Sequence, residues 1–166
     1  MKFSVGEYVM YGTSGVCRVS GTEMRNFDGQ SEKEYLRLEP LSTGTSKYYI
    51  LSDNAESKIR KLLSRDEINA LIDEMPQTEE IWYNDNSERK AAFNSIIKSD
   101  DYRQIISMVK SLHSHKLKKT SGGKKLSASD ENFMKRAENL MYQEFAAVLG
   151  INQEEIQDYI VQRIEN

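Results

Sequence analysis

The spacing of hydrophobic residues changes near residue 62, and this change divides the chain into two differently folded parts. Before it, apolar residues lie in short runs separated by glycines such as Gly12 and Gly15. After it, apolar residues recur at intervals of three and four, as they do on one face of a helix. Strands and helices have different periods, so the sequence predicts an α+β chain with a β domain at residues 1–62 and an all-α domain at residues 63–166.

The first part is predicted to contain four or five short strands. Glu34–Leu38 alternates polar and apolar residues, as a half-buried strand does, and Pro40 ends it. Asp28-Gly29 predicts a hairpin turn ahead of this strand. Ser42–Thr45 predicts a turn before a further strand at Lys47–Leu51. So many short strands in about 60 residues predict a small β-barrel.

The second part is predicted to be a bundle of four to five helices. Ser64 and Glu67 form a capping box at the start of the first helix, and Pro76 closes it. Ser129 is the expected cap of the fourth helix. The later helices are expected at residues 84–98, 100–118, 129–150 and 152 onward, with a loop at residues 120–123.

Composition and termini favour a cytosolic protein. No apolar run reaches the ~18 residues of a membrane span. Met1–Val5 has no apolar signal-peptide core, and Cys17, the single cysteine, has no partner for an internal disulfide. We therefore expect a cytoplasmic, nucleoid-associated chain with no membrane partner.

Charge is unevenly distributed along the chain. The net charge is −3, but residues 89–136 carry twelve Lys/Arg against four Asp/Glu, a local net charge of +8. A basic stretch of this kind can present a positive face to nucleic acid. The alternative is an ordinary solvated helical surface.

No catalytic or cofactor-binding pattern is found. The sequence has no G-x-G-x-x-G and no P-loop. Cys17 follows Val16 in a strand pattern and is interpreted as a core residue. His113 and His115 diverge by about 200° on a helix, so they are not expected to share a metal. We expect a non-enzymatic protein without cofactor or metal.

The segment Phe3–Val19, FSVGEYVMYGTSGVCRV, resembles the start of CarD-type transcription regulators, a module also found in the transcription-repair coupling factor. The family pattern is roughly F-x-V-G-D-x-V-V-Y-P-x-H-G-V-G-x-V, with Gly12 and Ser14 here in place of the proline and histidine. The resemblance continues through Glu34–Leu36, Asn54–Glu56 and Ile59–Leu62, and then Trp82 and the basic helices.

The resemblance implies two interfaces. The N-terminal module would be a Tudor-like, SH3-like barrel that binds the RNA polymerase β subunit, partly by edge-strand pairing. Arg25 matches a family arginine at that contact. A second family arginine falls near Tyr49, where Lys47 can supply the charge.

The helical domain would then contact promoter DNA. In the family, a tryptophan at the position of Trp82 wedges into the minor groove at the edge of the melted promoter. Without the resemblance, Trp82 would be interpreted as a hydrophobic staple on the following helix. The phosphate contacts are expected from the neighbouring basic residues, namely Arg89, Lys90, Lys116, Lys118, Lys119, Lys124 and Lys125.

The resulting hypothesis is a transcription regulator, monomeric, that binds polymerase and stabilises the open complex without reading DNA sequence. One alternative is a protein-interaction adaptor without a DNA role, favoured by the acidic residues Asp85 and Glu88 after Trp82. Another is an RNA-binding module that uses Tyr48, Tyr49 and the lysines.

Overall fold

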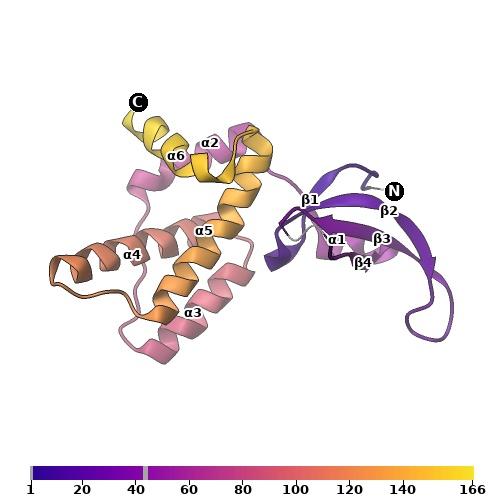
Figure 1. The fold of residues 1–166 in the computed structure, drawn as a ribbon, viewed down its shortest axis with the longest axis horizontal. Helices are drawn as coiled ribbons and strands as arrows, with labels where there is room; N and C mark the ends of the chain where they lie inside the picture. The colour runs from indigo at the N-terminus through magenta and orange to yellow at the C-terminus, as the bar shows by residue number, and fades with distance from the viewer. Residues whose placement is uncertain (1, 43–44) are drawn as a thin grey trace. The chain divides into compact units, whose positions relative to one another are not determined.

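The computed structural model describes residues 2–42 and 45–166, so Thr43 and Gly44 of the expected turn lie outside the described residues. The chain forms two compact units, Met1–Leu63 and Ser64–Asn166. The first contains a β-sheet and the second contains helices (Figure 1), so the chain is α+β.

The first unit is a five-stranded antiparallel sheet with the order β4-β3-β2-β1-β5. A four-residue helix, α1, and the two-residue strand β5 were not predicted from the sequence. The strands pair only with their neighbours in this order among the described residues, so β4 and β5 are edges and a closed barrel is not confirmed. The elements are β1 (Tyr8–Met10), β2 (Val16–Arg25), β3 (Lys33–Pro40), β4 (Tyr48–Leu51), α1 (Ala55–Lys58) and β5 (Arg60–Lys61), with 3₁₀ turns η1 (Gly12–Ser14) and η2 (Ser52–Asn54).

The inner face of the sheet carries the core of this unit. The predicted alternation in β3 is confirmed, since Leu36 and Leu38 are buried between more exposed neighbours. Cys17 is buried as predicted, and burial raises the pKa of its thiol to about 11. Gly12 has a φ of +48°, which proline cannot adopt. The core residues are Phe3, Val9, Cys17, Val19, Leu36, Leu38, Ile50, Ala55 and Ile59.

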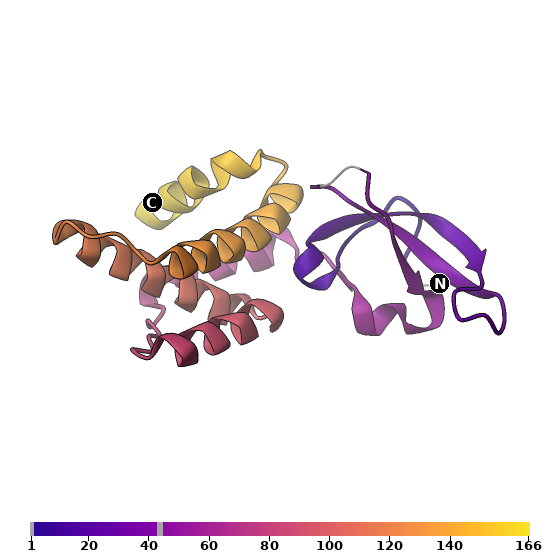
Figure 2. The ribbon, with the colours of Figure 1, turned by 60° about the horizontal axis from the view of Figure 1, so that its bottom comes forward.

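The predicted hairpin joins β2 to β3 through residues 26–32. The carboxylate of Asp28 accepts hydrogen bonds from the N–H groups of Gln30, at 2.8 Å, and Ser31, at 3.3 Å, and pairs with Lys33 at 3.0 Å. These contacts, led by the Gln30 bond, lower the pKa of Asp28 to about 2. Arg25 with Lys33 is the last β2–β3 pair, whereas β3 pairs with β4 only from Tyr35 onward. Figure 2 shows the connecting segment as a bent loop at the end of these strands.

The second unit contains five helices among the described residues. Two 3₁₀ turns, η3 (Met75–Gln77) and η4 (Gln153–Glu155), follow α2 and precede α6. None of the described helices is long and apolar enough to span a bilayer. The helices are α2 (Arg65–Glu74), α3 (Asn86–Lys98), α4 (Tyr102–Ser121), α5 (Ala128–Leu149) and α6 (Ile156–Glu165).

Most predicted helix ends are confirmed, and two are corrected. The capping box of Ser64 and Glu67 is present. The expected loop at residues 120–123 is half helical: α4 continues through Ser121, and the hydroxyls of Thr120 and Ser121 donate to carbonyls one turn back in the helix. The cap of α5 is Ser127 rather than Ser129: the Ser127 hydroxyl accepts from the N–H of Asp130 at 3.1 Å.

The helical core lies between α3, α4 and α5, while α2 and α6 pack together at one end of α5 (Figure 1). The largest fully buried side chains include Phe93 from α3, Met108 and Leu112 from α4, and Phe145 from α5. The Tyr102 hydroxyl donates to the buried carboxylate of Glu144 at 2.6 Å, which joins α4 to α5.

Candidate nucleic-acid and protein interfaces

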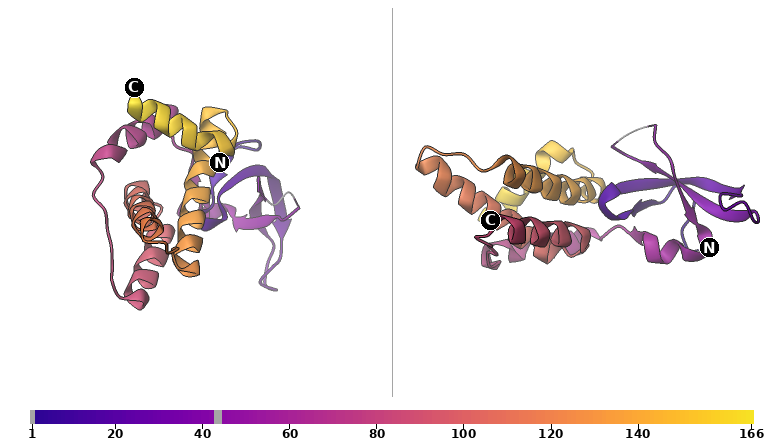
Figure 3. Two further views of the ribbon diagram at one scale, coloured as in Figure 1. Left: turned by 60° about the vertical axis from the view of Figure 1, so that its left-hand side comes forward. Right: turned by 90° about the horizontal axis from the view of Figure 1, so that it is seen from below.

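Residues 78–85, called the strap here, carry Trp82 between η3 and α3. Figure 3 shows this connection as an extended run without helix or strand. The Lys110 ammonium donates to the Thr78 carbonyl at 2.7 Å, and the Ser107 hydroxyl donates to the Glu79 carbonyl. The Ile81 N–H donates to the Ser111 hydroxyl at 2.7 Å. Ser107 and Ser111 are four residues apart, so one face of α4 holds the strap along its length.

The indole ring of Trp82 is partly buried and contacts three side chains. The His115 imidazole is stacked on it, with ring centroids 3.4 Å apart and an interplanar angle of 12°. Phe93 meets it edge-on at 6.2 Å, and the guanidinium carbon of Arg89 is 4.7 Å from its centroid. The ring is therefore held by α3 and α4 rather than projecting freely from the strap. Its contact with Phe93 is the kind that the staple interpretation predicts.

Arg89 forms a buried ion pair and does not face solvent, contrary to the expectation from sequence. Its side chain pairs with Asp130 through two bonds of 3.0 Å, and the two residues are 6% and 1% exposed. It also donates to the Tyr83 carbonyl at 2.9 Å and to Asn86 at 2.6 Å. Because these bonds occupy the guanidinium, Arg89 joins the strap to α3 and α5 instead of being available to a phosphate.

The predicted lysines lie in different environments. Lys118 and Lys119 follow His115 by three and four residues, so they lie one turn further along the face of α4 that carries the imidazole. Lys116 is paired with Glu131 at 3.2 Å. The remaining predicted lysines are exposed, Lys90 on α3 and Lys124 and Lys125 in the loop between α4 and α5. Of the six, only Lys116 has an ion pair with a described residue.

The two histidines have separate partners. His115 lies on Trp82, and its burial, followed by the positive charge of Lys118, lowers the pKa of the imidazole. His113 instead contacts the carboxylate of Glu138 at 3.3 Å. In the part of the chain that the structure describes, no group of three His, Cys, Asp or Glu residues is arranged to hold a metal ion.

The outer face of the β2–β3 hairpin carries a cluster that we call the hairpin patch: Arg25, Phe27, Tyr35 and Tyr49. Phe27, 57% exposed, meets Tyr35 at 4.9 Å and Tyr49 at 5.5 Å between ring centroids. The Arg25 guanidinium lies 5.3 Å from the Tyr49 ring and donates to its hydroxyl at 3.4 Å. The structure thus brings together Arg25 and Tyr49, both predicted contact residues. Lys47 is exposed just ahead of β4.

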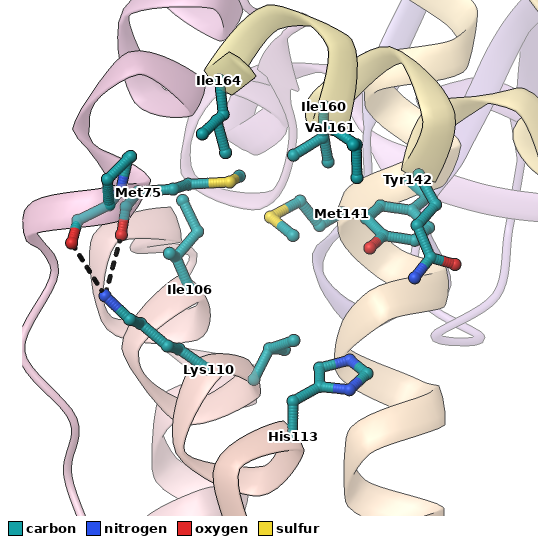
Figure 4. Close-up of a pocket in the computed structure, with 12 residues that line it drawn as sticks. Met75, Ile106, Lys110, His113, Met141, Tyr142, Ile160, Val161 and Ile164 are labelled. Carbon is teal, nitrogen blue, oxygen red and sulfur yellow. Dashed lines mark hydrogen bonds between the residues drawn. The ribbon is translucent and has the colours of Figure 1, made fainter. Parts of the chain in front are cut away.

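An open apolar pocket of about 380 Å³ lies in the helical unit between η3, α4, α5 and α6 (Figure 4). Lys110 borders it and bonds to the carbonyls of Met75 and Pro76 at 3.1 Å each. Val161 and Ile164 at its rim are 45% and 42% exposed. The lining residues are Met75, Pro76, Ile106, Val109, Lys110, His113, Met141, Tyr142, Gln157, Ile160, Val161 and Ile164.

Comparison with protein families gives two matches along the chain. Residues 3–63 match the CarD-like/TRCF RID domain, and residues 60–161 match the CarD C-terminal domain. The chain belongs to the CarD family. A search of curated proteins found no match.

The CarD family consists of non-enzymatic transcription factors that interact with RNA polymerase. In this CarD-family chain, the polymerase-interaction domain contains the hairpin patch, and the C-terminal domain contains the strap. Sequence reasoning missed three contributors: Phe27, His115 and the Ser107–Ser111 pair. Only Phe27 had a local signal, since an aromatic residue in a polar turn beside a matched arginine indicates a contact surface.

Proposed function

We propose that this CarD-family protein binds the β subunit of RNA polymerase through residues 1–62 and stabilises the promoter open complex with its helical unit. Trp82 meets the edge of the melted DNA, and Lys118, Lys119 and the exposed lysines near them contact phosphates without reading sequence. A preference of about 1.4 kcal/mol for the open state shifts the ratio of open to closed complexes tenfold.

The observation that carries the DNA role is the position of Trp82, which stacks on the face of α4 that carries Lys118 and Lys119 one turn later. A wedge must resist displacement when it contacts a base step, and the strap is bonded to α4 through Ser107 and Ser111. Lysines on the same face of α4 supply attraction to the backbone next to that step. Arg89 enters this proposal as a support for Trp82, not as a phosphate contact.

The polymerase role is supported by the hairpin patch and the edge strand β4. Tyr49 belongs to both, since it lies in β4 and contacts Arg25 and Phe27. A partner strand added to β4 gains backbone hydrogen bonds, and the neighbouring aromatic and arginine side chains supply specificity. Binding to polymerase raises the local concentration of the helical unit at the promoter, so weak intrinsic DNA affinity is sufficient.

The test is Trp82→Ala in the full-length chain, with thermal stability and open-complex lifetime measured on the same protein. We expect a shorter lifetime at equal folded fraction and little change in binding to intact duplex, because a wedge acts only where base steps are opened. Truncating a buried tryptophan costs about 3–5 kcal/mol. A large loss of stability with an unchanged lifetime would assign Trp82 to a structural role.

A second candidate function is a protein-interaction adaptor tethered to polymerase without DNA binding. The specific observation in its favour is the open apolar pocket with the exposed residues Val161 and Ile164 at its rim. Crosslinking within a polymerase–promoter complex separates the two functions: DNA crosslinks from the strap and α4 support open-complex stabilisation, whereas protein crosslinks from α6 support the adaptor.

A further inference from the structure

We infer that His115 is a positioning residue for Trp82: its imidazole ring holds the indole in the orientation in which it meets DNA. This inference rests on the proposed function, because it assigns to His115 the task of fixing the residue proposed as the wedge. In this role the His115 imidazole acts through Trp82 and does not itself contact DNA.

The first support is the geometry of the stack. A centroid distance of 3.4 Å and an interplanar angle of 12° place the two rings face to face and nearly parallel. Rotation of the indole about its side-chain bonds would separate the rings, so the stack selects one orientation of Trp82. His115 can impose this orientation because it lies on α4, a 20-residue helix packed against α3 and α5.

The second support is that α4 fixes the backbone and the side chain of the strap at adjacent points. Ser111 accepts a hydrogen bond from the N–H of Ile81, the residue before Trp82. His115 lies one helical turn after Ser111 and stacks on the Trp82 ring. Ser107 bonds to the Glu79 carbonyl one turn earlier. Residues 107, 111 and 115 therefore form a single row on α4 that matches the strap from Glu79 to Trp82.

The surroundings of His115 keep its ring neutral near pH 7. Lys118 and Lys119 from α4 and Arg89 from α3 place positive charge near it, and Glu80 of the strap is the negative group that opposes them. Burial and the Lys118 charge lower the pKa of His115 below its ordinary value of 6.5. The folded chain thus binds this proton less readily than the unfolded chain, so the contribution of His115 to the free energy of unfolding is fully present above pH 6.5 and is lost as the pH falls below it.

The stack is expected to lengthen the open-complex lifetime because it fixes the Trp82 side chain before DNA is bound. Immobilising one free side chain on binding costs roughly 0.5–1.5 kcal/mol, which corresponds to about a two- to tenfold change in lifetime. We therefore expect His115→Ala to shorten the open-complex lifetime by about two- to tenfold. His115→Phe keeps a flat ring against the indole and should restore most of the lifetime.

A spectroscopic experiment tests the stack without DNA or polymerase. Trp82 is the single tryptophan, so the emission of the full-length chain comes from this ring plus the tyrosines, which selective excitation leaves out. A protonated imidazole quenches indole emission more strongly than a neutral one. We expect emission to fall as the pH drops below 6.5, and this titration to be absent from His115→Ala and His115→Phe. His113→Ala is the matched control and should retain it, because His113 contacts Glu138 instead.

The outcomes separate this inference from the proposed function. If Trp82→Ala leaves the open-complex lifetime unchanged, the proposed function fails, whatever the emission shows. If Trp82→Ala shortens the lifetime but a folded His115→Ala matches the wild type, the positioning role is overturned. An emission titration that survives in His115→Phe, or that His113→Ala removes, would also overturn it. These two emission results remain decisive if His115→Ala does not fold.

Discussion

Arg89 and Lys90 are adjacent basic residues of α3 with opposite environments. Arg89 is 6% exposed and bound to Asp130 through two hydrogen bonds, whereas Lys90 is exposed. A buried charge that loses its partner is strongly destabilising, because the remaining ion is left desolvated. The same pair can often be replaced by apolar residues at little cost, since both ions are then removed.

Arg89→Met should therefore lower the free energy of unfolding by about 3–5 kcal/mol, and Lys90→Met should change it by no more than about 0.5 kcal/mol. Urea denaturation followed by circular dichroism measures both. The double variant Arg89→Met with Asp130→Leu should recover most of the loss. Equal small effects of the two single variants would contradict the buried pair.

The environments of these residues were only partly predictable from sequence. Arg89 is spaced four, seven and eight residues before Phe93, Ile96 and Ile97, which is the buried face of α3, so the helical period contains a signal for its burial. A count of charged residues does not distinguish Arg89 from Lys90, because each contributes one positive charge. The stack of Trp82 on His115 joins residues 33 positions apart in sequence, and no local pattern indicates such a contact.

Arg25 is the residue with which to test the hairpin patch. Arg25→Glu should weaken binding to an isolated lobe of the polymerase β subunit (the β lobe). The substitution removes the guanidinium from Phe27 and Tyr49 and places a second carboxylate beside Glu23. A pull-down measures binding, and circular dichroism measures folding. Lys58→Glu makes the same charge change at an exposed site outside the hairpin patch and should bind normally. Unchanged binding by a folded Arg25→Glu would remove Arg25 from the interface.

At the scale of elements, α4 combines two tasks on one face. Its middle holds the strap through Ser107, Ser111 and His115, and its last turns carry Lys118 and Lys119. Helix spacing aligns these residues, so the side chains that support the proposed wedge and the lysines proposed to contact phosphates belong to one rigid element. The alignment of these residues on one face could be predicted from the sequence, because it follows from the 3.6-residue period of a helix. The packing of the strap against that face could not be predicted.

Lys118→Ala with Lys119→Ala should lower the salt dependence of DNA association. Each phosphate contact contributes roughly 0.9 to the slope of log affinity against log salt, so we expect the slope to fall by about one to two. Lys116→Ala is the control within α4 and should change the slope less, because Lys116 is already paired with Glu131. Titrations of one duplex at several salt concentrations measure the slopes, and equal slopes in all three proteins would contradict the assignment.

The ends of the elements show where sequence reasoning succeeds and where it fails. The capping boxes at Ser64 and Asn152 involve residues three apart, so a local pattern reveals them. Ser127 and Ser129 are both plausible caps by residue type, and only the backbone geometry selects Ser127. The two-residue strand β5 depends on pairing with β1, about 50 residues earlier, and therefore has no strand pattern of its own.

At the scale of the whole molecule, the two compact units coincide closely with the two family matches, at residues 3–63 and 60–161. In the proposed function the two units act as a linked pair. Once the first unit has bound polymerase, the contact of the second unit with DNA becomes intramolecular. The effective concentration of the second unit at the DNA is then set by the connection between the units. The covalent link is thus part of the proposed mechanism, because the proposal assigns polymerase binding to the first unit and DNA contact to the second.

Two fragments, residues 1–63 and 64–166, test this linkage. Each has its own buried core, so each should melt cooperatively alone, and the helical fragment should keep its far-ultraviolet signal. The first fragment should bind the β lobe without lengthening the open-complex lifetime. The second should lengthen it only at concentrations far above those at which the intact chain acts, since short flexible links provide effective concentrations on the order of millimolar.

Mixing the fragments should not restore the activity of the intact chain at equal concentration. Full activity of the mixture would show that the link is dispensable, and an unfolded helical fragment would show that the two units depend on one core.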